Sequence, residues 1–328
     1  MLHLEHDYLW DFWTLQHQGK THLFYLYAPR SLPHPEDRHA NARVGHAVSE
    51  DLIHWDVLQE ALGPSPQSAW DDRAIWTGSV MALPDGRFAM PYTSSSLAED
   101  GKIQRVGMAF SEDLIRWEKH PEPVLEADPR FYEQETQIRG KELHFRDPYI
   151  VREADGRYRV FVTARLREGG EYFGRGCIAT ATSTDLIQWE SEPAAAALPG
   201  VFQLEVPQFW QAHGRDYLFF STGADCILPG YGVPRLTGTF YLVREPGESE
   251  YRYGGVTIGT DGFGRQGRFF GSEKYILKLL PDASGRTVAL WWFGYDWEGN
   301  FSGTLSEPVP VRFDPESGDV VLGDFAGG

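Results

Sequence analysis

Residues 47–55 read AVSEDLIHW, and nearly the same stretch returns as AFSEDLIRW at residues 109–117 and as ATSTDLIQW at residues 181–189. In each copy an apolar segment runs into a serine, two polar residues follow, and Leu-Ile-x-Trp begins the next apolar segment. Serine and aspartate favour turns because their side chains form hydrogen bonds with nearby backbone amides. The stretch therefore predicts a repeated unit in which a strand, a tight turn and a packed tryptophan follow one another.

A second pattern, a glycine-containing turn between two apolar runs, occurs five times along the chain. The turns contain Gly19, Gly86, Gly156, Gly214 and Gly285. Two apolar runs joined in this way are typical of a β-hairpin. Short strands at regular spacing, without a sustained helical periodicity, predict an all-β five-bladed β-propeller, which we expect to form a single domain over residues 1–328 with no C-terminal β-sandwich.

A β-sandwich and a parallel β-helix are the competing architectures. The strands of a sandwich do not recur in multi-strand units of this length, and the turns of a β-helix are much shorter, so the propeller fits the spacing better. The last part of the chain, PVPVRFDPESGDVVL from residue 308 onward, reads as strands that could close the ring with the first blade.

Composition narrows the range of partners. The 328 residues include 30 basic and 47 acidic side chains, a formal net charge of -17. Nucleic acid is a poor partner for such a chain, because nucleic-acid binders need a basic face to displace counterions. The two cysteines, Cys177 and Cys226, are too few for a disulfide scaffold.

The sequence gives no sign of targeting or of metal binding. The first seven residues are too polar for a secretory signal, and no segment is apolar for long enough to span a membrane, so we expect a cytoplasmic location and no membrane partner. His34, His39 and His46 lie near one another, but their spacing does not fit a helical zinc site. We expect an exposed loop and a core histidine there, and neither a metal nor a cofactor.

Three carboxylates, Asp11, Asp147 and Glu205, precede the second strand of blades one, three and four by nearly the same number of residues. The first strand of each propeller blade lines the central channel, so the three acids should converge at its mouth, with residues 76–79 (WTGS) of blade two beside them. Each acid alone is also compatible with a turn or strand end. Crowded carboxylates raise one another's pKa, which glycosidases exploit, and the shared position favours a joint site.

The same residues belong to motifs that resemble the retaining fructosidase clan, glycoside hydrolase families 32 and 68. The similar motifs are HLFYLYAP at residues 22–29, GHAVSEDLIHW at 45–55, WTGS at 76–79, RDP at 146–148 and GTLSEP at 303–308. Residues 9–13, LWDFW, look more like the Trp-Asp-x-Trp of levansucrases than the Asn-Asp-Pro-Asn-Gly of family 32, and residues 205–208, EVPQ, differ from its Glu-Cys.

The resemblance implies a retaining glycosidase that cleaves terminal β-fructofuranosidic bonds of sucrose or short fructo-oligosaccharides, with a small carbohydrate as its partner. Asp11 would be the nucleophile, Glu205 the general acid/base and Asp147 the transition-state stabiliser. The residues expected to bind substrate are Trp10, Trp76, Thr77, Ser79, Arg146 and Asp72, the last of which is equally compatible with a loop cap.

Three other functions stay open at this point. LWDFW is compatible with a fructosyltransferase of levansucrase type. The fold is compatible with another furanosidase, such as an arabinofuranosidase. It is also compatible with a sugar-binding propeller that has lost catalysis. The presence of all three acids disfavours the last of these, and RDP with the invertase-like pattern of blade one disfavours the second. No feature of the sequence indicates an oligomeric state.

Overall fold

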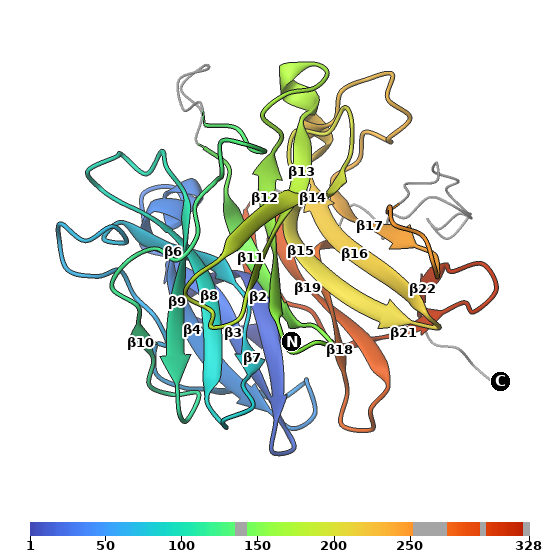
Figure 1. The fold of residues 1–328 in the computed structure, drawn as a ribbon. Coiled ribbons are helices and arrows are strands. Elements are labelled where there is room, and N and C mark those ends of the chain that lie inside the picture. The colour runs from blue at the N-terminus through green and yellow to red at the C-terminus, as the bar shows by residue number, and fades with distance from the viewer. Residues whose placement is uncertain (135–142, 252–273, 296–299, 324–328) are drawn as a thin grey trace.

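The computed structural model describes residues 1–134, 143–251, 274–295 and 300–323, and the strands in these residues form five antiparallel sheets. The sheets follow one another around the molecule in chain order, from the blue N-terminal sheet to the red C-terminal one (Figure 1). The first strands of neighbouring sheets contact one another all the way round, including the last with the first. The prediction of a five-bladed β-propeller is confirmed.

The blades are built from consecutive strands, whose bounds are as follows. The first blade contains β2 (Asp7–His17), β3 (Lys20–Pro29), β4 (Arg43–Ser49) and β5 (Asp56–Val57). The second contains β6 (Ala74–Gly78), β7 (Met81–Ala82), β8 (Phe88–Ser95), β9 (Arg105–Ser111) and β10 (Glu118–Lys119). The third contains β11 (Arg146–Arg152), β12 (Tyr158–Arg165), β13 (Gly176–Ser183) and β14 (Glu190–Ala197).

The fourth blade contains β15 (Glu205–Ala212), β16 (Arg215–Thr222) and β17 (Gly238–Arg244). The fifth contains β18 (Tyr275–Pro281), β19 (Thr287–Tyr295), β20 (Phe301–Leu305), β21 (Val309–Phe313), β22 (Val320–Leu322) and β1 (Leu2–His3). In the described ranges, three short 3-10 helices connect strands: η1 (Pro35–Asn41), η3 (Tyr172–Gly174) and η4 (Ala224–Cys226). Among the described residues, no helix has the length and apolar character needed to cross a membrane.

Each of the five predicted glycine turns lies in the loop that leads from the innermost part of a blade into the second long strand of that blade. Gly19 and Gly285, for example, have φ values of 77° and 82°, in the left-handed region that side chains with a Cβ rarely adopt. The positions of the hairpins are therefore confirmed by the backbone conformation that glycine permits.

The repeated Ser-x-Asp-Leu-Ile-x-Trp stretch forms the same turn in blades one, two and three. In blade one the Ser49 hydroxyl accepts the Leu52 amide, the Asp51 carboxylate accepts two further amides, and the Trp55 indole donates to the Leu52 carbonyl at 3.2 Å. The equivalent bonds recur around Asp113 and Asp185. The repeat thus encodes the turn from the third strand of a blade to its fourth.

The ring closes differently from the prediction. The segment from residue 308 onward was read as strands that could close the ring with the first blade, but β21 pairs with β19 inside the fifth sheet, and the N-terminal strand β1 pairs with β20. Leu2 faces Leu305 in this pairing. The start of the chain is therefore built into the last blade, which closes the ring by backbone hydrogen bonds.

A pair of histidines lies in the core of blade one. His46 of β4 is 0% exposed, its ring stacks on Phe24 with centroids 4.4 Å apart, and its Nε2 lies 3.0 Å from Nδ1 of His22 on β3. Burial lowers the pKa of His46 to about 3, and burial together with the neighbouring His17 and Lys20 lowers the pKa of His22 to about 4. The expected core histidine at position 46 is confirmed.

This pair predicts a loss of stability in acid. Because both histidines have lower pKa values in the folded chain than in the unfolded chain, the unfolded state binds more protons as the pH falls below about 6.5. We expect the Tm of the wild-type protein to fall by about 4 °C more than that of His46→Leu between pH 6.5 and pH 4.5. Thermal unfolding at several pH values measures both slopes, with the exposed His6→Gln variant as control. Equal slopes for His46→Leu and the wild type would contradict the prediction.

Candidate active site

All five innermost strands lose their regular pairing at one level of the channel. The irregular positions fall between Leu9 and Phe12, Trp76 and Gly78, Arg146 and Tyr149, Glu205 and Gln208, and Tyr275 and Lys278. An irregular position in a strand redirects the side chains beside it. The irregular segments of blades one to four contribute side chains to a pocket of about 320 Å³.

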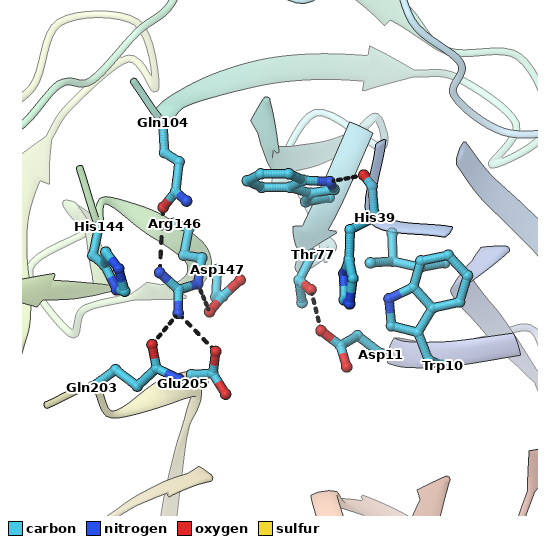
Figure 2. A pocket seen from close by; sticks show the side chains of 12 residues that line it. Trp10, Asp11, His39, Thr77, Gln104, His144, Arg146, Asp147, Gln203 and Glu205 are labelled. Carbon is cyan, nitrogen blue, oxygen red and sulfur yellow. Dashed lines mark hydrogen bonds and ion pairs between the residues drawn. The ribbon is translucent and has the colours of Figure 1, made fainter. Parts of the chain in front are cut away.

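The pocket brings together the three acids singled out in the sequence. The residues that line it are Trp10, Asp11, Leu26, His39, Trp76, Thr77, Gln104, His144, Arg146, Asp147, Gln203 and Glu205. Figure 2 shows Asp11, Thr77 and His39 on one side, facing Arg146, Asp147 and Glu205 on the other. The predicted convergence of carboxylates from blades one, three and four is therefore found in the structure.

The acids of blades three and four are not strictly equivalent, however. Arg146, not Asp147, is the residue that matches Glu205, because both pair with the second strand just before the irregular position. Asp147 lies one residue further and matches Val206, and both have positive φ values, 59° and 50°. Counting residues from the hairpins missed this shift because the two hairpins have turns of different length.

Asp147 is held by donors that converge on one of its oxygens. Its Oδ2 accepts the Val206 amide at 3.1 Å, and the Thr163 hydroxyl and Arg146 Nε lie 3.0 and 3.4 Å from the same atom. The side chain is 4% exposed. Burial raises the pKa of Asp147 to about 7, Arg146 opposes this, and the charge of Glu205 adds to it. The carboxyl is thus poised to change its ionisation near neutral pH.

Replacing Asp147 by asparagine should therefore stabilise the protein at high pH. The donors that surround Oδ2 can bond to an amide oxygen as well, whereas the buried charge is gone. Since the pKa is higher in the folded state, the wild-type protein loses stability as the pH rises from about 4 to about 7. We expect the variant to be more stable than the wild type by about 2 kcal/mol at pH 8 and nearly equal to it at pH 4, in unfolding measured at both pH values. A difference that does not change with pH would contradict the raised pKa.

Asp11 of β2 lies across the pocket and has one strong partner. The Thr77 hydroxyl of blade two donates to its Oδ2 at 2.7 Å. Burial raises the pKa of Asp11, the Thr77 bond lowers it, the charge of Glu205 raises it, and His39 and Lys278 lower it. Thr77 thus orients this carboxylate and favours its charged form.

Glu205, at the start of β15, has a separate donor on each oxygen. Arg146 donates to Oε1 at 2.7 Å, and the Tyr275 hydroxyl donates to Oε2. Arg146 also donates to Gln203 at 2.9 Å and to Gln104 at 3.3 Å, so its guanidinium is fixed between three blades. Burial and the negative charge of Glu205 raise the pKa of Tyr275 well above its usual value, which keeps the hydroxyl protonated as a donor.

Sequence reasoning missed several residues of the pocket, above all His39. This residue belongs to η1, between β3 and β4, and its ring meets Trp10 edge to face with centroids 6.2 Å apart. The Trp76 indole donates to the His39 carbonyl at 2.7 Å, which holds the short helix against the pocket wall. His39 is half exposed, as expected, but its place in the pocket wall was not predicted, because the irregular 3-10 turn has no periodic signal that could have placed it.

Two of the predicted substrate-binding residues lie elsewhere. Asp72 accepts the amides of Ser68 and Leu97 and so caps two loops. Ser79 is 2% exposed, and its hydroxyl accepts the Ile150 amide of the next blade at 3.0 Å. Neither lines the pocket, whereas Trp10, Trp76, Thr77 and Arg146 do.

Solved structures share this architecture. Inulosucrase from Halalkalicoccus jeotgali, bound to kestose, matches with a TM-score of 0.79 and 21% identity over 97% of this chain and 87% of that one. Fructan 1-exohydrolase IIa from Cichorium intybus matches with a TM-score of 0.72 and 20% identity over 99% of this chain and 60% of that one. At these identities the likeness supports the fold alone.

Curated relatives match parts of the chain at higher identity. Acid beta-fructofuranosidase 4, vacuolar, of Arabidopsis thaliana is 33% identical over 169 residues, which are 48% of this chain and 22% of the relative. Beta-fructofuranosidase 1 of Zea mays is 30% identical over 205 residues, 60% of this chain and 28% of the relative. The chain therefore spans less than a third of each of these relatives.

These relatives contradict the prediction of a cytoplasmic location. One of them is a vacuolar protein by name, and the chain corresponds to only 22% of its length. The cellular location can therefore not be inferred from the polarity of the first seven residues of this chain.

The family model described as "Glycosyl hydrolases family 32 N-terminal domain" matches residues 13–295. The match includes Asp147 and Glu205 and begins two residues after Asp11. It extends over most of the chain and agrees with the motifs, the fold and the relatives. The chain therefore belongs to glycosyl hydrolase family 32, a family of glycosidases.

Proposed function

We propose that this protein is a retaining β-fructofuranosidase, which hydrolyses terminal β-fructofuranosidic bonds of sucrose or short fructo-oligosaccharides. The observation that carries the proposal is the separate bonding of the three acids in one pocket: Asp11 to Thr77, Asp147 to the Val206 amide, and Glu205 to Arg146 and Tyr275. Three carboxylates with three different environments are suited to three different roles. Membership of family 32 and the names of the relatives support the proposal that the sugar is fructose.

In the first step, Asp11 attacks the anomeric carbon while Glu205 gives its proton to the departing glycosidic oxygen, so that a fructosyl ester of Asp11 forms and the leaving sugar departs as an alcohol. Thr77 keeps the Asp11 carboxylate in place for the attack. In the second step, Glu205 takes a proton from water, the water oxygen bonds to the anomeric carbon, and the ester bond to Asp11 breaks.

Asp147 has the role of holding ring hydroxyls and stabilising the positive charge that develops on the sugar. Its known donors among the described residues all meet Oδ2, so Oδ1 is the oxygen suited to a sugar hydroxyl. Trp10 and Trp76 supply apolar walls for the C–H faces of the sugar.

We further propose that residues 1–328 act as one catalytic domain. The pairing of β1 with β20 supports this, because it joins the first described strand to the last blade. The two ends of the ring then depend on each other for backbone hydrogen bonds.

The test is incubation of the protein with sucrose, inulin, levan and nitrophenyl arabinofuranoside, followed by product analysis. Release of free fructose from sucrose or inulin is the expected result. Oligosaccharides longer than the substrate would indicate fructosyl transfer, and release of arabinose would indicate another furanosidase. No turnover of any fructoside would overturn the proposal.

A further inference from the structure

Lys278 is a buried lysine for which the sequence motifs indicate no role. It lies on β18, the innermost strand of blade five, at the end of the irregular segment that begins at Tyr275, and it is 4% exposed. Burial of a lysine is costly unless its charge and its donors are satisfied. The surroundings of its ammonium group therefore call for an explanation.

The ammonium group bonds to the backbone that carries Glu205. Lys278 Nζ donates to the Val206 carbonyl at 2.8 Å and lies 3.3 Å from the Pro207 carbonyl. Val206 follows Glu205 directly and has a φ of 50°, a conformation that is strained for a β-branched residue. Lys278 thus secures the strained turn of the chain immediately after the acid.

The same turn also holds Asp147. The amide of Val206 donates to Asp147 Oδ2, while its carbonyl accepts from Lys278. One residue, Val206, therefore links the lysine to both acids. If Val206 moved, both the position of Glu205 and the bond to Asp147 would change.

The charges that act on Lys278 come from two blades. Asp147 of β11 and Asp11 of β2 both favour its protonated form, whereas burial lowers its pKa to about 7. The Tyr149 ring of β11 lies 5.8 Å from Nζ, and burial raises the pKa of Tyr149 to about 12, so that this neighbour stays neutral. Below about pH 7, Lys278 is thus a buried cation beside two buried carboxyls.

We propose that Lys278 is a positioning residue of the active site, which holds the Val206–Pro207 turn beneath Glu205 and supplies positive charge that favours the ionised forms of Asp11 and Asp147. This role rests on the proposed function, because it concerns the same three acids. It differs from the roles of Arg146 and Thr77, which bond to the carboxylates directly.

The test compares Lys278→Met with Lys278→Arg and with a matched control, Lys119→Met. Lys119 is also a largely buried lysine, paired with Asp71 at 2.8 Å, but it does not line the pocket. The measurement is kcat/KM on sucrose as a function of pH. We expect Lys278→Met to lower kcat/KM roughly 100-fold. The acidic limb of the pH profile of kcat/KM should move upward by about one pH unit, because carboxyls without a nearby cation protonate at higher pH. Lys278→Arg should restore part of both, and Lys119→Met should have the acidic limb of the wild type.

An acidic limb of Lys278→Met that coincides with that of the wild type would overturn the electrostatic role, whatever the loss in rate. If the wild type hydrolyses no fructoside, the proposed function fails, and the thermal stability of the variants still tests the lysine. The wild type should then lose stability relative to Lys278→Met, measured by Tm, as the pH falls from about 7 to about 4, because the carboxyls become neutral and no longer attract the buried cation. A difference that stays constant over this range, as is expected for Lys119→Met, would also overturn the proposal.

Discussion

Asp11→Asn is expected to lower kcat on sucrose by ~10⁴-fold or more, with little loss of stability. The variant removes the attacking oxygen but keeps the size of the side chain and an acceptor for the Thr77 hydroxyl. Because burial raises the pKa of Asp11, the charged form is not what stabilises the fold at this position. Steady-state kinetics with thermal unfolding as a check of folding would measure both effects.

A smaller variant and a bond-deleting variant sharpen this test. In Asp11→Ala the missing carboxylate leaves space for azide, which should attack the anomeric carbon from the same side and give a fructosyl azide. Thr77→Val keeps the nucleophile and removes only its donor, so the loss in kcat should be far smaller, with the acidic limb at higher pH because the Thr77 bond lowers the pKa of Asp11. Turnover by Asp11→Asn at the rate of the wild type would show that the nucleophile is another residue.

The parts of the fold that the sequence predicts are those encoded by local rules. Gly19 and Gly285 have backbone conformations that favour glycine, and the turn around Asp51 depends on side chains within five residues of one another. Such features repeat from blade to blade, so the blades can be counted in the sequence. The closure of the ring cannot be predicted in this way, because the pairing of Leu2 with Leu305 depends on contacts between the two ends of the chain.

The residues of the pocket also fall into those that the sequence predicts and those that only the folded chain reveals. The acids of blades one, three and four could be placed near one axis from their positions in the repeats, whereas the shift of Asp147 against Glu205 depends on how the innermost strands are bent. His39 enters the pocket from a 3-10 helix of 7 residues, whereas the 3-10 helices at the equivalent connections of blades three and four have 3 residues each. Asp72 shows the converse, because an acid close to a motif in sequence proved to cap loops.

Tyr275 and Lys278 belong to blade five, whose innermost strand offers no carboxylate at the level of the pocket among the described residues. A search for acids therefore passes over this strand, although it supplies a donor to Glu205 and a cation near Asp11 and Asp147. Their contribution lies in charge and hydrogen bonding between blades, which only the assembled ring reveals. Supporting residues of this kind are harder to predict from one sequence than the groups that they support.

Glu205→Gln is expected to lower kcat by a factor that depends on the leaving group of the substrate. The glutamine oxygen can still accept from Arg146, and the amide nitrogen can donate to the Tyr275 hydroxyl, but the side chain cannot give a proton to the glycosidic oxygen. We expect kcat on sucrose to fall by roughly 10²- to 10⁴-fold, because the leaving sugar needs that proton. A fructoside with a nitrophenyl leaving group should lose much less in the first step, since that group departs as a stable anion. Rates on both substrates, measured side by side, give the ratio that identifies the acid.

Tyr275→Phe is the matched control for this ratio. It removes one of the two donors to Glu205 but leaves the carboxyl and its proton in place, so both substrates should slow by a similar factor. Azide should accelerate the second step of Glu205→Gln, because it needs no general base, and it should have little effect on Tyr275→Phe. If Glu205→Gln slowed sucrose and the nitrophenyl fructoside equally, Glu205 would not be the proton donor, and its bonds to Arg146 and Tyr275 would have to be explained by binding alone.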